Sequence, residues 1–339
     1  MKKLRIGMIG AGGIAQARHL PAFQKLNDLV EIHAICDVNL DRAKEVASTY
    51  QIPVVSNDYL DIFSEVDAVC ICTPNKFHAE IAIAALESGL HVFCEKPMAL
   101  TAKECEAMIN ASKKQEKVLA IAYHYRFKRE AQAAKKSMSE VGTPLVVRVR
   151  ALRQRKVPSW GVFTNKELQG GGSLIDWGCH FLDLALWLIG NPTETDVTGS
   201  IYNKLSKMPN QVNEWGAFNH ETFEVDDHVS AFIKFENGTS MLFETSWAAN
   251  IKKDEEHLSI SGVEGGLNVF PFELYTTKDG MLLNSVPPWL PGEEQPDIPQ
   301  ARNFIEACLG RSELVLKPEE ALQVSRIIDK IYENGGSLS

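Results

Sequence analysis

Over the first third of the chain, two patterns of apolar and polar positions alternate, one typical of strands and one typical of helices. Short apolar runs predict buried strands, and segments with apolar residues at helical spacing come between them. Strands are expected at Leu4–Ile9, Val30–Cys36, Val66–Cys72, His91–Cys94 and Val118–Tyr123. Helices are expected at Ile14–Leu26, Leu40–Tyr50, Phe77–Leu86 and Ala102–Lys114. This alternation predicts an α/β domain, a doubly wound parallel sheet with helices on both faces.

After residue 124 the pattern of apolar positions changes, and apolar residues at every second position predict further strands. Asn237-Gly238 separates two of these strands and is a strong signal for a hairpin. Strands are expected at Val146–Leu152, Val229–Phe235, Met241–Trp247, His257–Ile260 and Leu267–Phe270, and helices at Lys128–Ser139, Leu174–Ile189, Ala301–Cys308 and Pro318–Tyr332. The pattern predicts two domains, residues 1–124 and 125–339, the second an α+β domain on a mostly antiparallel sheet.

The composition narrows the class of protein. With 35 basic and 44 acidic residues, the 339-residue chain carries a net charge of −9, which argues against a nucleic-acid partner. No apolar run reaches the roughly 18 residues of a membrane-spanning helix. The apolar run at Leu4–Ile9 is too short for a signal peptide. We therefore expect a cytoplasmic protein without a membrane partner.

The seven cysteines are an odd number, and most lie inside apolar runs. They are therefore expected to be buried thiols in a reducing compartment. Cys70 and Cys72 would share one face of a strand, as a pair of metal ligands does. Because no second pair stands at zinc spacing, no metal is expected.

The candidate chemistry begins at a glycine-rich turn. Gly10–Ala15 matches the pattern G-x-G-x-x-A, directly after the first expected strand and before the first helix. Gly10 permits the tight turn, and Gly12 lets a pyrophosphate approach the backbone at the start of the helix. Asp37 ends the next strand, where a carboxylate accepts from ribose hydroxyls and repels a 2′-phosphate. The motif predicts a dinucleotide site that prefers NAD, while the nearby Arg42 leaves NADP possible.

Two further groups follow expected strands and so belong to the ligand-binding edge of the sheet. Thr73-Pro74-Asn75 follows the third strand, and Asn75 either bonds the nicotinamide ribose or forms an ordinary Asx turn. Glu95-Lys96-Pro97 follows the fourth strand. Lys96 either stabilises a developing oxyanion or is a solvated surface lysine, and position alone favours the second interpretation.

One helix carries polar residues where burial is expected. Gly170–Ile189 is apolar nearly all round, as in a buried helix, yet Asp176, His180 and Asp183 fall on one stripe. Unpaired charges are costly to bury, so the stripe must face partners or a pocket. Asp176 one turn before His180 suits a general base whose tautomer is fixed by a carboxylate. A purely structural Asp–His pair is the alternative.

Weaker candidates lie elsewhere. Arg126 follows the last strand of the first domain and is a candidate for binding polar substrate groups, and Trp160 is a candidate for lining a pocket. Trp215 lies in a loop-like insert, Lys207–Thr222. Asp226-Asp227-His228 opens a strand, where neighbours point to opposite faces, so a solvated strand end is expected rather than a metal site.

Taken in order, these motifs resemble the glucose–fructose oxidoreductase/inositol dehydrogenase family, also called Gfo/Idh/MocA. The resemblance rests on Gly10–Ala15 with Asp37, on Thr73-Pro74-Asn75, on Glu95-Lys96-Pro97 and on the run GGSLIDWGCH at Gly171–His180. The Glu-Lys-Pro and Gly-Gly-x-x-x-Asp-x-x-x-His elements are specific to that family in combination. Their order and spacing cover essentially the whole chain.

The resemblance implies an N-terminal Rossmann domain and a C-terminal domain with a large open sheet, through which homodimers or homotetramers form. It implies NAD(P)-dependent alcohol–ketone chemistry on a sugar, inositol or related polyol, with His180 as general acid/base, Lys96 stabilising the oxyanion and Asp176 as the third catalytic residue. The expected substrate contacts are Lys96, Arg126, Trp160, Asp176 and His180. The expected cofactor contacts are Gly10, Ala11, Gly12, Gly13, Ile14, Asp37, Thr73, Asn75, His78, Glu95 and Lys96. Two alternatives remain on the same fold, an NAD-dependent redox-neutral glycosidase and a non-catalytic NAD-binding regulator.

Overall fold

The computed structural model describes residues 3–336, which form two compact units. The first unit runs to His124 and also contains Gln295–Ser325, and the second consists of Tyr125–Glu294 and the chain from Arg326. Within the described residues, no helix combines the length and the apolar character that a bilayer-crossing segment requires.

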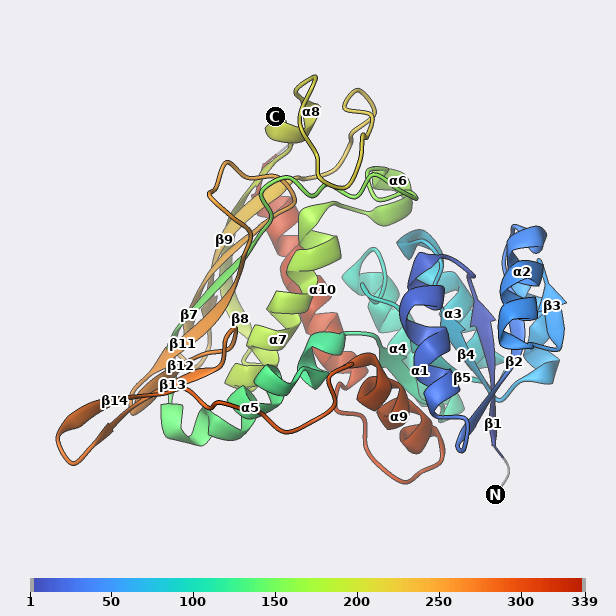
Figure 1. The fold of residues 1–339 in the computed structure, drawn as a ribbon, viewed down its shortest axis with the longest axis horizontal. Helices are drawn as coiled ribbons and strands as arrows, with labels where there is room; N and C mark the ends of the chain where they lie inside the picture. Colours follow the sequence, from blue (N-terminus) through green and yellow to red (C-terminus); the bar gives the residue numbers. More distant parts are fainter. Residues whose placement is uncertain (1–2, 337–339) are drawn as a thin grey trace. The chain divides into compact units, whose positions relative to one another are not determined.

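Six parallel strands form the sheet of the first unit, in the order β3-β2-β1-β4-β5-β6 (Figure 1). Their bounds are β1 Leu4–Ile9, β2 Val30–Cys36, β3 Val54–Ser56, β4 Ala68–Ile71, β5 His91–Cys94 and β6 Leu119–Ile121. The main helices between them are α1 Leu20–Lys25, α2 Leu40–Tyr50, α3 His78–Glu87 and α4 Ala102–Gln115, with 3₁₀ turns at Tyr59–Glu65 and Asn75–Phe77. The predicted doubly wound parallel sheet is confirmed, and its strand order reverses at β1, which places the ligand-binding edge at the carboxyl ends of β1 and β4.

Two local features depart from the predicted pattern. The expected helix Ile14–Leu26 is divided into a π-helical turn, η1 (Ala15–His19), and the α-helix α1. Pro21 lies in the first turn of α1, a position that needs no N–H donor within the helix. Strand β3 was not predicted, because its three half-buried residues carry no hydrophobic period.

Helix α9 (Asp297–Cys308) belongs to the first unit, although the predicted second domain, 125–339, contained it. Phe304 of α9 is 1% exposed and stacks on Phe93 of β5, with ring centroids 5.1 Å apart. Ile305 joins the same hydrophobic core. The predicted range is therefore corrected, because burial of this apolar face ties the segment to the first unit rather than to its neighbours in sequence.

An eight-stranded sheet forms the second unit, in the order β14-β13-β12-β11-β7-β10-β9-β8. Its strands are β7 Pro144–Leu152, β8 Glu194–Tyr202, β9 His228–Phe235, β10 Ser240–Ser246, β11 Glu255–Gly262, β12 Gly265–Asn268, β13 Glu273–Lys278 and β14 Met281–Ser285. Only the β7–β10 pair is parallel among these neighbours, so the predicted mostly antiparallel sheet is confirmed. The predicted hairpin is also confirmed, with Gly238 at φ +84° between β9 and β10.

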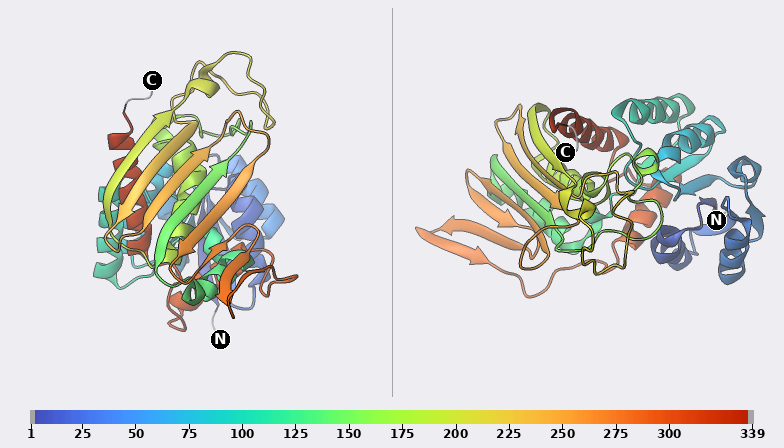
Figure 2. Two further views of the ribbon diagram at one scale, coloured as in Figure 1. Left: turned by 90° about the vertical axis from the view of Figure 1, so that its left-hand side faces the viewer. Right: turned by 90° about the horizontal axis from the view of Figure 1, so that it is seen from above.

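The two faces of this sheet differ in what covers them. Helices α5 (Arg129–Val141) and α7 (Cys179–Ile189) contact one face, which carries fully buried side chains such as Val147 and Ile233. The opposite face is open (Figure 2, left) and carries Phe232 and Leu242, which are 38% and 47% exposed. The open sheet that the resemblance implied is therefore present.

A buried carboxylate fixes the start of the central helix of the second unit. This helix begins as a π-helical turn, η5 (Leu174–Gly178), and continues as α7. Asp226 accepts from the backbone N–H groups of Gly172 and Leu174 at 2.8 and 2.9 Å, and from the hydroxyls of Ser173 and Tyr332 at 2.8 and 2.7 Å. A Cβ atom at Gly172 would lie 1.9 Å from the Asp226 carbonyl oxygen, so only glycine fits there. Asp226 thus caps the helix and selects glycine beside it.

The predicted solvated strand end at Asp226-Asp227-His228 is wrong. Asp226 and Asp227 are each 1% exposed. Asp227 accepts from the backbone N–H of Ser206 at 2.7 Å, and burial raises the pKa of its carboxyl to about 6. Their hydrogen bonds to backbone and hydroxyl donors make these two carboxylates structural anchors.

A second buried charge belongs to Arg126, which the sequence analysis placed among the substrate contacts. The side chains of Arg126 and Asp183 are both 0% exposed. The guanidinium Nε donates to Asp183 Oδ2 at 2.9 Å and Nη2 donates to Oδ1 at 2.6 Å, and the Arg126 Cζ lies 5.5 Å from the ring centroid of Trp187. The expected substrate contact is corrected, because this guanidinium is committed to a carboxylate in the core. The same pair explains why helix α7 tolerates Asp183.

Removal of one partner of this ion pair is expected to destabilise the protein strongly. Arg126→Met leaves the Asp183 carboxylate buried without its cation, which should cost about 3–5 kcal/mol of unfolding free energy. The double variant Arg126→Met/Asp183→Leu removes both charges and should regain most of that loss. Denaturant unfolding of the two variants measures the difference. Equal losses in both would show that packing against Trp187, and not the charge pair, holds Arg126 in place.

Candidate active site

The glycine turn lies at the carboxyl end of β1, against the end of β4. Gly10 has φ +97°, and a Cβ atom on it would lie 2.6 Å from the backbone oxygen of Cys72. This close approach explains why glycine is required at the first position of the motif. Cβ atoms built on Gly12 and Gly13 meet no atom of residues 3–336 within 4 Å, so the backbone there faces open space.

These residues fit a dinucleotide. A pyrophosphate needs room beside backbone N–H groups at the start of a helix, which Gly12 and Gly13 leave open. The Thr73 hydroxyl, just after the neighbouring strand, is covered and makes no hydrogen bond to any of the described residues. A ligand oxygen at this edge would satisfy it. Gly10–Ile14 and Thr73 are therefore suitable for holding NAD.

Asp37 ties the end of β2 to the glycine turn. One carboxylate oxygen accepts from the backbone N–H of Ala11 at 2.8 Å and from Arg42 Nε at 3.1 Å, and the other accepts from Asn39 N–H at 2.9 Å and Arg42 Nη2 at 2.6 Å. Burial by itself raises the pKa of this carboxyl, but the bonds from Arg42, Ala11 and Asn39 outweigh it, and the pKa is lowered. Asp37 is therefore ionised, and its two carboxylate oxygens accept hydrogen bonds both from backbone N–H groups and from the Arg42 guanidinium.

His78 was expected to contact the cofactor, and the structure gives it another role. It is 0% exposed, with Nδ1 2.8 Å from the Pro97 carbonyl oxygen and Nε2 3.0 Å from that of Thr73. Burial lowers the pKa of the ring. The expected cofactor contact is corrected, because both ring nitrogens face backbone carbonyls. His78 instead joins the loops that follow β4 and β5.

Glu95 connects a buried histidine to the backbone of Lys96. His19 Nε2 and Glu95 Oε1 lie 2.7 Å apart, with both residues under 10% exposed, and Glu95 Oε2 accepts from the Lys96 N–H at 3.0 Å. Burial by itself lowers the pKa of His19, but Cys72 and Glu95 raise it to about 9. Burial likewise opposes ionisation of Glu95, but its bond to His19 keeps the carboxyl pKa low. A charged pair thus holds the turn that presents Lys96.

The same histidine lies near two thiols. Ligand atoms of His19, Cys70 and Cys72 are within 4.8 Å of one another. Burial raises the pKa of the Cys70 thiol, and a hydrogen bond to Cys70 together with burial raises that of Cys72. A metal ion bound by these three groups would have to displace the protons that burial keeps on the thiols.

In the second unit, Asp176 lies within the π-helical turn η5. Its Oδ2 accepts from the Trp247 indole Nε1 at 3.1 Å and lies 3.9 Å from Arg153 Nη1. His180 follows in α7, is 5% exposed and packs on the ring of Tyr125 at a centroid distance of 5.0 Å. The predicted contact between Asp176 and His180 assumed a regular α-helix, and π-helical turns recur at functional sites. That contact stays a prediction.

Aromatic rings extend outward from Asp176. The Arg153 guanidinium lies between two indoles, 4.1 Å from the centroid of Trp177 and 4.6 Å from that of Trp215. The ring centroid of Trp215 in turn lies 5.3 Å from that of Trp160, and Trp160 is 53% exposed. Both outer tryptophans were candidates from their sequence positions. Arg153 carried no such signal, because its position follows from the pairing of strands distant in sequence.

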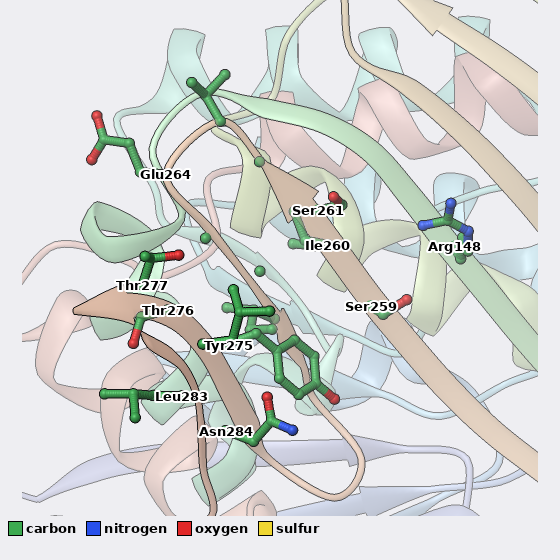
Figure 3. Close-up of a pocket in the computed structure, with 16 residues that line it drawn as sticks. Arg148, Ser259, Ile260, Ser261, Glu264, Tyr275, Thr276, Thr277, Leu283 and Asn284 are labelled. Atoms are coloured by element: carbon green, nitrogen blue, oxygen red, sulfur yellow. The ribbon is translucent and has the colours of Figure 1, made fainter. Parts of the chain in front are cut away.

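A separate groove lies on the edge of the second unit's sheet (Figure 3). It is lined by residues of β7 and β11–β14, including Arg148, Ser259, Tyr275 and Asn284. No residue predicted for cofactor or substrate lines it. The groove is therefore distinct from the candidate active-site residues.

The His19–Glu95 pair predicts a pH dependence of stability. Because the pKa of His19 is raised from 6.5 to about 9, the stabilisation is fully present below pH 6.5 and is lost as the pH rises through 9. Thermal unfolding from pH 6 to 10 should show a steeper fall for the wild type than for His19→Gln. His33→Gln is the matched control, since His33 pairs with Glu31 at the surface. Parallel curves for wild type and His19→Gln would show that His19 is neutral in the folded protein.

Comparison with known proteins gives matches over both units. Residues 4–123 match the model of the oxidoreductase family with an NAD-binding Rossmann fold, and residues 131–268 match the Gfo/Idh/MocA C-terminal domain. The D-glucoside 3-dehydrogenase of Escherichia coli is 34% identical over 336 residues, covering 98% of this chain and 95% of that protein. The levoglucosan dehydrogenase of Pseudarthrobacter phenanthrenivorans is 30% identical over 297 residues, covering 80% and 75%.

A solved structure supports the same relationship. A levoglucosan dehydrogenase in complex with NADH and levoglucosan superposes with a TM-score of 0.84 at 25% identity, covering 98% of this chain and 97% of that one. The two family models together span well over half of the chain. The chain therefore belongs to the Gfo/Idh/MocA family and is an NAD-dependent dehydrogenase.

Proposed function

We propose that this enzyme interconverts an alcohol and a ketone on a sugar, inositol or related polyol. The observation that carries the proposal is the buried and largely apolar helix η5–α7, which carries a carboxylate, Asp176, and an imidazole, His180, besides Asp183, whose charge Arg126 pairs. Burial of such groups is costly unless they serve chemistry or one another. The relatives named for a glucoside and for levoglucosan act on carbohydrates, which supports a polyhydroxylated substrate.

The roles of the residues follow from their chemistry. Gly10–Ile14 and Thr73 would hold NAD⁺, which would supply the acceptor for the hydride of the carbinol carbon. His180 takes the proton of the substrate hydroxyl and returns it in the reverse direction. Lys96, held by its backbone bond to Glu95, supplies positive charge to the developing oxyanion. Asp176 favours the imidazolium form of His180 through its own negative charge, and Trp247 and Arg153 keep that carboxylate in place.

We further propose that the first unit binds the dinucleotide and that the second binds the substrate and forms homodimers or homotetramers. The open sheet face supports the oligomer, because Phe232 and Leu242 pair across β9 and β10 and are both exposed on it. We also propose a cytoplasmic location. All seven cysteines have free thiols, which suits a reducing compartment.

The role of His180 predicts a loss of turnover without a loss of cofactor binding. His180→Ala should lower kcat by roughly 10²–10⁴-fold, since general acid–base catalysis contributes that much. NADH formation from NAD⁺ and a panel of sugars, sugar acids and inositols measures the wild-type activity and the loss. His228→Ala is the matched control, because His228 pairs with Glu244 near the start of β9. Full activity of His180→Ala would remove the assignment, and release of an aglycone without net NADH would indicate a redox-neutral glycosidase.

The contacts of Asp37 predict the basis of cofactor preference. Asp37→Ala removes the acceptor for ribose hydroxyls and releases the Arg42 guanidinium, which then suits a 2′-phosphate. The affinity for NAD should fall by about tenfold or more, since a bond to a charged group is lost. The affinity for NADP should fall much less, and calorimetric titration with both cofactors gives the two constants. Asp41→Ala, on the exposed first turn of α2, is the control. Equal losses for both cofactors would contradict this explanation.

A further inference from the structure

The outer tryptophans of the second unit form a stacking surface that the proposed chemistry leaves unused. Trp215 and Trp160 lie 5.3 Å apart with their planes at 47°, and Trp160 remains 53% exposed. Exposed indoles are costly in solvent and typical of binding sites. Their position in the fold connects them directly to Asp176.

Arg153 forms this connection. Its guanidinium stacks on Trp215 at 4.6 Å and its Nη1 lies 3.9 Å from Asp176 Oδ2. The Nη1 group is buried and makes no hydrogen bond among the described residues. A buried donor without an acceptor costs free energy, and a ligand oxygen reaching it relieves that cost. The unsatisfied donor therefore lies between the catalytic carboxylate and the tryptophan pair.

The two tryptophans are held in place before any ligand binds. The side chain of Asn213, on the same loop as Trp215, accepts from the Val157 N–H at 2.8 Å and donates to the Val157 carbonyl at 2.8 Å. The backbone N–H of Glu214 donates to the Arg155 carbonyl at 2.9 Å. The loop 153–163 is bonded in turn to the end of β10, where Arg153 N–H donates to the Ser246 carbonyl at 2.9 Å. A surface fixed in this way binds a ring at little conformational cost.

We propose that Trp215 and Trp160 bind a second pyranose ring, so that the preferred substrate is a glycoside whose aglycone is itself a sugar. This proposal rests on the proposed function, in which the reacting sugar lies at Asp176. A ring stacked on Trp215 is separated from Asp176 by the Arg153 guanidinium and so belongs to a different sugar unit. Pyranose rings present flat apolar C–H faces to indoles while their hydroxyls bond to groups such as the Arg153 N–H. The 207–222 insert, which carries Trp215, is then a specificity element.

The test compares two glucosides that differ only in the aglycone. Cellobiose carries a second glucose ring, and methyl β-glucoside carries a methyl group. With NAD⁺ present, Trp215→Ala should raise KM for cellobiose about tenfold more than it raises KM for methyl β-glucoside, because both substrates depend equally on the Arg153–Asp176 pair but only cellobiose reaches the tryptophans. Trp160→Ala should act in the same direction, and Trp215→Phe should retain most of the effect because it keeps an aromatic face. Trp289→Ala, at another exposed tryptophan of the second unit, is the matched control and should change neither KM.

Direct binding separates failure of this inference from failure of the proposed function. Titration of cellobiose, followed by tryptophan fluorescence, should give about a tenfold higher dissociation constant for NAD-loaded Trp215→Ala than for the NAD-loaded wild type and Trp289→Ala. This readout does not need turnover, so it tests the stacking surface even if neither glucoside is oxidised. Equal changes in KM for both glucosides in Trp215→Ala, or no quenching of the wild type by cellobiose, would overturn the inference. A changed oligomeric state of Trp160→Ala with unchanged binding would overturn it too, and would assign the tryptophans to a contact between copies.

Discussion

The organisation of the second unit depends on one buried carboxylate. Asp226 accepts four hydrogen bonds, and a carboxylate left unpaired in such surroundings would cost several kcal/mol. Its donors come from the start of the central helix and from Tyr332 near the end of the chain, so they can be satisfied only together. The glycine at 172 follows from the same constraint, because the backbone of Asp226 occupies the space of a side chain. Two residues after the last of these donors in the helix comes Asp176.

Each unit contains a buried ion pair beside a proposed catalytic group. Glu95 bonds His19 on one side and the backbone of Lys96 on the other. The Arg126–Asp183 pair follows Tyr125, whose ring packs on His180. In both places a buried charge pair lies close in the chain to a proposed catalytic residue: Glu95 directly before Lys96, and Asp183 three residues after His180. Such a pair is costly in solvation, but it holds side chains in one orientation, which catalysis requires.

Much of the fold and of the cofactor site was predictable, because it depends on residues that are close together in the sequence. The parallel strands and the glycine turn follow from hydrophobic period and spacing, and the strand-end motifs follow from chain direction. The roles of Arg126 and Asp226 did not, since each depends on a partner far away in sequence. The role of His78 depends on backbone carbonyls of two loops, Thr73 and Pro97, whose direction the sequence does not reveal. The edge strands β8 and β14, the neighbouring β13 and the short β3 escaped prediction, because partly exposed or very short strands lack a clear alternation of apolar residues. The π-helical turns at Ala15–His19 and Leu174–Gly178 keep the composition of ordinary helices and leave no distinct trace.

Because helix α9 belongs to the dinucleotide-binding unit, that unit consists of two segments of the chain with the second unit between them. The family match to that unit ends at residue 123, yet Phe304 completes its core by stacking on Phe93. A fragment that ended at residue 124 would therefore lack part of its hydrophobic core, and the face of Phe93 that packs on Phe304 would be exposed to water. The nucleotide-binding module of this enzyme is thus not a portable piece that recombination at the boundary could transfer intact to another protein. Transfer would require residues 295–325 as well as residues 1–124, so we expect these two segments to evolve together.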